Sequence, residues 1–169
     1  KDFVPLASLN DIVFGGWDIF EEDSYEAAKT AGVLEPALLD QIKPELEAIT
    51  PMSAVFDQRY VRRLDGPNVK KGRNKRDLAE QVSDDISRFQ KDKGLDRMVM
   101  VWCGSTEVYR EQGEVHSSLP KFEKGLDESH PDILPSMIYA YCAIKEGIPY
   151  CNGAPNLSGD FPAMVDLAK

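Results

Sequence analysis

An amphipathic helical stretch followed at once by an apolar run sets the fold class of this chain. In residues 76–93 the apolar side chains recur at steps of four, four and three residues, at Leu78, Val82, Ile86 and Phe89, and Gly94 follows. This spacing is typical of a helix with one buried face that glycine ends. In residues 97–103 the side chains from Met98 to Trp102 are apolar without alternation, as in a central strand of a parallel sheet that is covered on both faces. This succession predicts an α/β protein.

The same alternation extends along the rest of the chain. We expect a strand over residues 11–14 that ends in Gly15-Gly16, and helices over residues 25–31 and 36–49, with Gly32 between them and a kink at Pro44. Further on we expect helices over residues 118–126 and 135–146, a strand over residues 148–151, and a last helix to Leu167 that Asp160 caps. Strands that alternate with crossover helices predict a Rossmann-type, doubly wound parallel sheet, which we expect to be incomplete here.

Composition limits the partners that this chain can have. Its 169 residues, 42% hydrophobic and 29% charged, suit one globular domain with a core. The formal charge of −9 argues against nucleic acid and anionic membranes as partners, and no apolar run in the sequence reaches the length of a bilayer-spanning helix. Three cysteines without a CxxC pair, Cys103, Cys142 and Cys151, predict reduced thiols in the core and a cytoplasmic location.

Residues 62–75 have the composition of an exposed loop between packed elements, with an Asp-Gly-Pro-Asn turn at 65–68. Basic side chains gather at its end, namely Lys70, Lys71, Arg73, Lys75 and Arg76. They can contact an anion, or they can simply be solvated.

Glycine and small polar residues follow each predicted strand. The first strand leads into residues 15–19, the second into residues 104–107 and the third into residues 152–156. In an open parallel sheet ligands bind at the carboxyl ends of the strands, and glycine lets a ligand approach the backbone closely. We therefore expect Asp18, Thr106 and Gly153 to converge on one cleft.

Asp18 has two interpretations. An acidic side chain at a strand end of this fold accepts hydrogen bonds from the ribose hydroxyls of an adenosine. It can equally cap the helix that follows. Thr106 and Asn152-Gly153 likewise have an alternative role as ordinary turn residues.

The sequence lacks the motifs of metal sites, serine hydrolases and glycine-rich phosphate-binding loops. His116 and His130 have no carboxylate or cysteine at metal-ligand spacing, so we expect no metal site. The sequence has no GxSxG elbow, no GxxxxGK[ST] phosphate loop and no GxGxxG fingerprint. Glu107 does not form an acid/base pair with its neighbour Thr106.

Five ordered blocks resemble the myo-inositol-1-phosphate synthase family. Residues 16–19 resemble its GWDI, and residues 24–28 with 33–35 its first helix. Residues 51–53 match a Pro-x-Ser turn, and residues 102–109 resemble W-T-A-N-T-E-R-Y. Residues 134–136, followed by 146–155, resemble A-P-S and E-G-V-P-Y-I-N-G-S-P. After Pro155 the family's Q-N-T-F-V-P-G is replaced by residues 156–162 with one extra residue, so we carry no side-chain role across there.

The resemblance implies a set of NAD-binding residues. Asp18 and Ile19 would hold the adenosine end of the cofactor, with Ser53 beside it. Gly104 and Thr106 would place their backbone near the pyrophosphate and the nicotinamide ribose. Gly153 would lie at the entrance to the reaction centre.

The resemblance also implies an activity. Family members convert glucose 6-phosphate to a myo-inositol phosphate by oxidation, aldol cyclisation and reduction with NAD. We expect the same sugar-phosphate substrate and a homo-oligomer, a tetramer by resemblance. We expect a glycine-rich first turn and a lysine-bearing catalytic segment outside residues 1–169, so that this piece alone is inactive. Two alternatives stay open, namely a synthase-like nucleotide-binding or regulatory protein, and an NAD-dependent sugar dehydrogenase or epimerase.

Overall fold

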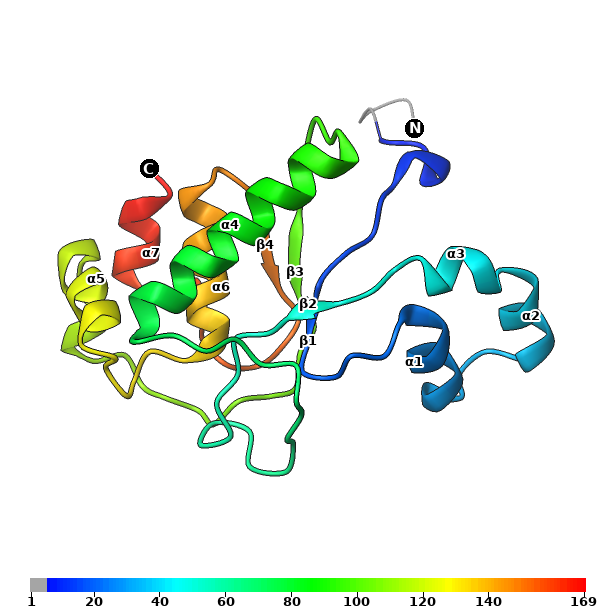
Figure 1. The fold of residues 1–169 in the computed structure, drawn as a ribbon. Coiled ribbons are helices and arrows are strands. Elements are labelled where there is room, and N and C mark those ends of the chain that lie inside the picture. Colours follow the sequence, from blue (N-terminus) through cyan, green and yellow to red (C-terminus); the bar gives the residue numbers. More distant parts are fainter. Residues whose placement is uncertain (1–5) are drawn as a thin grey trace.

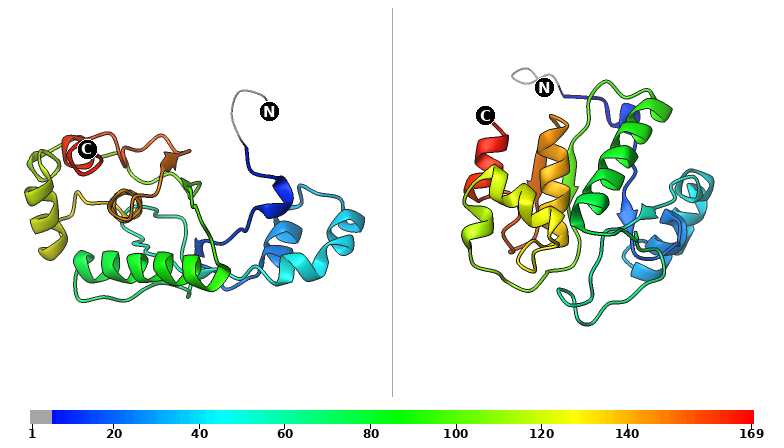
Figure 2. Two further views of the ribbon diagram at one scale, coloured as in Figure 1. Left: turned by 90° about the horizontal axis from the view of Figure 1, so that it is seen from above. Right: turned by 60° about the vertical axis from the view of Figure 1, so that its left-hand side comes forward.

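The computed structural model describes residues 6–169 as an α/β arrangement of helices and short strands (Figure 1). In chain order the elements are η1 (Leu9–Asp11), β1 (Trp17–Asp18), α1 (Ser24–Ala31), α2 (Pro36–Gln41), α3 (Lys43–Glu47), β2 (Met52–Ser53), α4 (Lys75–Lys93), β3 (Met100–Trp102), η2 (Glu114–His116), α5 (Leu119–Asp127), α6 (Pro135–Lys145), β4 (Tyr150–Asn152) and α7 (Pro162–Leu167). Helices α1 to α3 form a lobe to one side of the other elements (Figures 1 and 2).

The strands pair in parallel, in two short ladders. β1 pairs with β2, so that Asp18 lies opposite Ser53. β3 pairs with β4 over three residues, with Val101 opposite Cys151. A parallel bridge between Ala54 and Val69 lies beyond β2. These parallel pairs, connected through helices, confirm the predicted α/β class with an incomplete Rossmann-type sheet.

The first strand lies later in the chain than predicted. Residues 11–14 are exposed, Phe14 by 67%, and join no ladder within the described residues. By contrast, the carbonyl of Gly16 accepts a hydrogen bond from the backbone N–H of Met52 at 2.8 Å. β-prone side chains form a strand only where a partner strand is within reach, and here the partner β2 is reached only from Gly16 onward.

Two of the helices end at the glycines that the sequence predicts. Helices α1 and α4 end at Gly32 and Gly94, whose φ angles of 63° and 61° are left-handed, as glycine permits. The single helix predicted over residues 36–49 is wrong. Ile42, with φ −118° and ψ 20°, separates α2 from α3, because Pro44 in the first turn of α3 has no N–H to continue the ladder of α2.

The last helix also starts differently from the prediction. Helix α7 begins at Pro162, with Phe161 at the N-cap position and no side-chain capping bond. The predicted cap by Asp160 is therefore wrong, because Pro162 fixes the backbone at the first helical position and the start lies one residue too late for Asp160 to cap.

Helix α6 is the centre of the hydrophobic core. All residues from Pro135 to Ala143 are buried, and α6 packs against α4, α7, β3 and β4. Helix α4 contributes Ala79, Val82 and Ile86 to the same core. No helix within residues 6–169 is both long and apolar enough to cross a membrane.

The strand β3 is covered on one face only. Val99 and Val101 are 68% and 56% exposed, whereas Met100 and Trp102 pack against the core. Helices α4 and α6 both lie on one side of β3 and β4 (Figures 1 and 2). The predicted burial of both faces of this strand is therefore wrong for the described residues.

Two lysines of the predicted exposed loop are buried. The side chain of Lys70 is 9% exposed, and its Nζ lies 2.6 Å from Oδ2 of Asp85. Lys75 begins α4, and its Nζ donates to the Tyr60 hydroxyl at 3.1 Å and to the His130 carbonyl at 2.6 Å. Because both ammonium groups already have protein partners, the anion-binding interpretation fails for them.

The Asp85 side chain connects α4, to which it belongs, with the first strand. Its Oδ2 also accepts a hydrogen bond from Trp17 Nε1 at 2.8 Å, and its Oδ1 contacts the guanidinium of Arg88. We expect Asp85→Ala to lower the free energy of unfolding by about 3 kcal/mol, because the buried ammonium of Lys70 would lose its counter-charge.

A denaturant titration measures this loss. Arg88→Ala is the matched control, because the Arg88 side chain is 61% exposed and a surface ion pair is worth about 0–1 kcal/mol. Equal losses for the two variants would contradict this role of Asp85.

Candidate functional site

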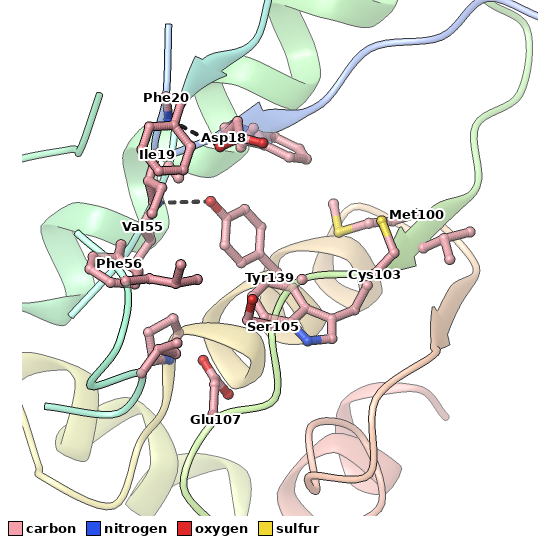
Figure 3. Close-up of a pocket in the computed structure, with 18 residues that line it drawn as sticks. Asp18, Ile19, Phe20, Val55, Phe56, Met100, Cys103, Ser105, Glu107 and Tyr139 are labelled. Atoms are coloured by element: carbon pink, nitrogen blue, oxygen red, sulfur yellow. Dashed lines mark hydrogen bonds between the residues drawn. The ribbon is translucent and has the colours of Figure 1, made fainter. Parts of the chain in front are cut away.

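A cavity of about 440 Å³ opens between the ends of β1 and β3. Its lining comes from residues 17–20, 54–56, 61, 64, 100–105, 107, 135 and 139 (Figure 3). Both strands line it along their length, and the lining continues past their carboxyl ends to residues 19–20 and 103–105, where ligands bind in open parallel sheets.

Asp18 lies at this cavity and does not cap a helix. Its Oδ1 accepts a hydrogen bond from the backbone N–H of Phe20 at 3.0 Å, which forms a tight local turn. The N-cap of α1 is Asp23 instead, whose Oδ1 accepts from the N–H groups of Tyr25 and Glu26. The helix-cap interpretation of Asp18 is therefore wrong, and its exposed carboxylate retains acceptor capacity toward the cavity.

Ile19 and Ser53 support the same corner of the site. Ile19 is buried and lines the cavity. Ser53 lies beside Asp18 in the ladder but does not line the cavity, since its Oγ donates to Oδ1 of Asn68 at 2.6 Å. Asn68 Nδ2 in turn donates to the carbonyls of Asp18 and Phe20. In the sequence Asn68 is recognisable only as part of a turn, because its role in holding β1 depends on contacts with residues far away in the chain.

The second strand end brings Gly104 to the cavity. A Cβ at Gly104 would lie 3.0 Å from the ring of Trp102, so the backbone packs closely there. Thr106 is exposed and does not line the cavity, although Ser105 and Glu107 on either side of it do.

Gly153 lies beside this strand end rather than in the cavity. Its N–H donates to the carbonyl of Trp102 at 2.9 Å, and a Cβ on Gly153 would lie 3.0 Å from the same oxygen. The structure therefore brings Asp18, Ile19 and Gly104 together at the cavity and leaves Thr106 and Gly153 outside its lining, so the predicted convergence of Asp18, Thr106 and Gly153 on one cleft is wrong for the last two.

An aromatic wall that the sequence did not indicate closes one side of the cavity. The ring of Tyr139, from α6, lies between Trp17 and Trp102, with centroid distances of 5.1 and 5.5 Å. Its hydroxyl accepts a hydrogen bond from the backbone N–H of Val55 at 2.8 Å (Figure 3). Burial raises the pKa of Tyr139 well above its usual value, so the phenol stays neutral.

His116 has a structural role. It is buried, its Nδ1 accepts from the N–H of Gly113 at 3.0 Å, and its Nε2 lies 3.1 Å from the carbonyl of Asp132. Burial lowers the pKa of His116, which favours the neutral ring that these two bonds require. No group of three or more potential metal ligands occurs within residues 6–169.

Comparison with known proteins identifies the family. A family model described as myo-inositol-1-phosphate synthase, of the NAD-binding type, matches residues 1–169. The chain belongs to the myo-inositol-1-phosphate synthase family. This confirms the resemblance read from the five sequence blocks and the predicted cofactor, NAD.

Individual relatives agree with the family match. Inositol-3-phosphate synthase 1 of Bacteroides thetaiotaomicron is 46% identical over 170 residues, which cover 100% of this chain and 40% of that protein. Inositol-3-phosphate synthase 1 of Oryza sativa subsp. japonica is 33% identical over 99% of this chain and 33% of its own length. A crystal structure of inositol-3-phosphate synthase from Caenorhabditis elegans superposes with a TM-score of 0.92 at 30% identity, over 99% of this chain and 34% of that one. The chain thus spans a third to two fifths of these relatives.

The lining of the cavity suits a flat, uncharged group with hydroxyls beside it. Its walls are largely aromatic and aliphatic, and the exposed carboxylate of Asp18 adds a hydrogen-bond acceptor. No lysine, arginine or histidine is among the lining residues of the described chain. At Gly104 and Gly153 the backbone packs closely against Trp102, which leaves no room for a side chain there.

The carboxylate of Asp18 and that of Asp23 make a matched pair for testing the nucleoside site. In the full-length protein we expect Asp18→Ala to weaken NAD binding by about 1 to 3 kcal/mol with little change in melting temperature, because hydroxyl donors of the ribose lose their acceptor. Asp23→Ala should instead reduce stability by about 1 kcal/mol, the usual effect of losing an N-cap, with NAD binding unchanged.

Calorimetric titration with NAD, beside melting curves of the same samples, measures both quantities. Unchanged NAD affinity for Asp18→Ala would contradict the ligand role.

Proposed function

We propose that the full-length protein is an NAD-dependent isomerase that converts glucose 6-phosphate to a myo-inositol phosphate by oxidation, aldol cyclisation and reduction. The observation that carries this proposal is the match of the whole chain to the synthase family, including 46% identity with the Bacteroides thetaiotaomicron protein. The cavity supports it, because residues from three of the five resembling blocks line it, namely 17–19, 102–105 with 107, and 135.

Each predicted residue has a proposed task. Asp18 accepts hydrogen bonds from the adenosine ribose, and Ile19 packs against the base. Ser53 acts through Asn68, which fixes the backbone on either side of Ile19. Gly104 and Thr106 place their backbone near the pyrophosphate and the nicotinamide ribose, and Gly153 lies at the entrance to the reaction centre. Bound NAD supplies the hydride acceptor of the oxidation and the hydride donor of the reduction.

Further parts of the proposal concern partners and location. The proposed substrate is a sugar phosphate, and the proposed assembly is a homo-oligomer, a tetramer by family resemblance. Exposed apolar side chains at Phe14, Val99 and Val101 support contact with further protein surface. The three cysteines are free thiols, which supports a cytoplasmic location. Only Cys142 is buried, so the predicted core position is wrong for Cys103 and Cys151, which are exposed. The charge of −9 supports the absence of nucleic acid and membrane partners.

The assay compares the full-length protein with the 169-residue chain. Each is incubated with NAD and glucose 6-phosphate, and inositol phosphate is measured by chromatography and mass spectrometry. We expect turnover by the full-length protein only, because the cavity lining in the described chain has no cation to stabilise an enolate or a phosphate.

Three other outcomes would contradict parts of this account. Turnover by the 169-residue chain alone would show that its own residues carry the catalysis. A full-length protein that binds NAD without turnover would support a binding or regulatory role. Accumulation of NADH without inositol phosphate would support a sugar dehydrogenase, and an epimerised sugar phosphate without net NADH would support an epimerase.

A further inference from the structure

Glu107 is a buried carboxylate that the proposed residue roles leave without a task. It lies beyond the end of β3, is 3% exposed and borders the cavity close to Ser105 (Figure 3). Its Oε1 accepts a hydrogen bond from the backbone N–H of Ser136 at 3.0 Å. Its Oε2 accepts from the hydroxyl of Ser136 and, at 3.1 Å, from Nδ2 of Asn156. Both oxygens are therefore occupied by protein donors.

These bonds connect three separate segments. Glu107 belongs to the loop after β3, Ser136 to the first turn of α6, and Asn156 to the loop after β4. Asn156 Nδ2 also donates to Ser136 Oγ at 3.0 Å, so the three side chains form a closed triangle. The carbonyl of Asn156 accepts from Asn152 Nδ2 at 2.7 Å, which ties the triangle to the end of β4.

The carboxylate also serves as the cap of α6. The residue at the N-cap position, Leu134, has no side-chain oxygen, and Pro135 occupies the first helical position. Glu107 satisfies the free N–H of Ser136 and places its negative charge at the positive end of the helix dipole. Burial raises the pKa of Glu107, while the hydrogen bonds from Ser136 and the charge of Lys75 oppose that change.

We propose that Glu107 is a positioning residue of the NAD site, which holds the backbone at Gly104 and Thr106 against the loop that carries Gly153. The proposal rests on the proposed function, since the proposed function assigns the loops after β3 and β4 to NAD binding. Gly104 and Gly153 leave little freedom for the backbone of these two loops, because a side chain on either glycine would meet Trp102. Loss of the triangle would release the loop after β3, the start of α6 and the loop after β4 together.

Reversing the direction of one hydrogen bond gives a specific test. In Glu107→Gln the new Nε2 faces Nδ2 of Asn156, and if the Asn156 amide turns to offer its unpaired Oδ1, its Nδ2 loses both acceptors, Oε2 of residue 107 and Ser136 Oγ. In Asn156→Asp two carboxylates meet. In the double variant the amide of Gln donates to the carboxylate of Asp, while the amide oxygen still accepts from Ser136 N–H. The pair is thereby restored with its charge moved to position 156.

The measurements are the NAD dissociation constant and the separate KM values for NAD and glucose 6-phosphate, in the full-length protein. We expect each single variant to weaken NAD binding on the order of tenfold or more, because a buried polar group is left without its partner. The KM for glucose 6-phosphate should stay unchanged, and the double variant should recover most of the lost NAD affinity. Leu126→Ala, a core truncation in α5 away from the cavity, is the control for general destabilisation.

Each failure has its own meaning. A Glu107→Gln variant that melts earlier, as Leu126→Ala does, yet binds NAD like the wild type would overturn the positioning role alone. A double variant that binds NAD no more tightly than the single variants would overturn the positioning role as well, since the hydrogen-bonded triangle would not be the cause of the lost affinity. A wild-type protein that does not bind NAD would overturn the proposed function, and with it this assignment.

Discussion

The burial of helix α6 is the constraint on which the other elements depend. From Pro135 to Ala143 every side chain is buried, so strands, helices and loops must surround this helix on all sides. β3 and β4 cover one side of it, and α4 and α7 pack around the remainder. A helix buried in this way cannot use water to satisfy its first N–H groups. The protein must therefore supply an acceptor at that end, and Glu107 is that acceptor.

The same helix places the two walls of the cavity. Tyr139 projects between Trp17 and Trp102 and receives the N–H of Val55, which fixes the end of β2 relative to β1 and β3. Glu107, in the loop after β3, is held at the N-terminus of α6 by the hydrogen bond from the Ser136 N–H. Packing of the core and geometry of the cofactor site are thus consequences of one buried helix.

Local sequence patterns account for much of the fold and for the family. The helices that end at Gly32 and Gly94 follow from amphipathic spacing and from the backbone freedom of glycine, both of which are local properties. Strand positions are less local, because residues 11–14 have strand-forming side chains but no partner in the described chain, whereas Trp17 and Asp18 do. Pro44 interrupts a helix whose apolar spacing alone predicts continuity.

The site was only partly predictable from the sequence, because some of its residues depend on contacts with residues far away in the chain. Asp18 is the last residue of β1 and Gly104 lies just past the end of β3, so the general rule for ligand sites in parallel sheets finds both. Tyr139 and Glu107 act through bonds to residues 84 and 29 positions away, and no spacing in the sequence indicates such pairs. Asn68 likewise reaches back 50 positions to Asp18.

The central claim is that NAD binds at the cavity between the ends of β1 and β3, with Asp18 on its ribose. The most direct measurement is a crystal structure of the full-length protein with NAD bound. The account predicts ribose hydroxyl oxygens within about 3 Å of the Asp18 carboxylate, the length of an ordinary hydrogen bond, with Glu107 still bonded to Ser136 and Asn156. A cofactor bound away from the Asp18 carboxylate, or a Glu107 that has left Ser136 to contact the cofactor, would contradict it.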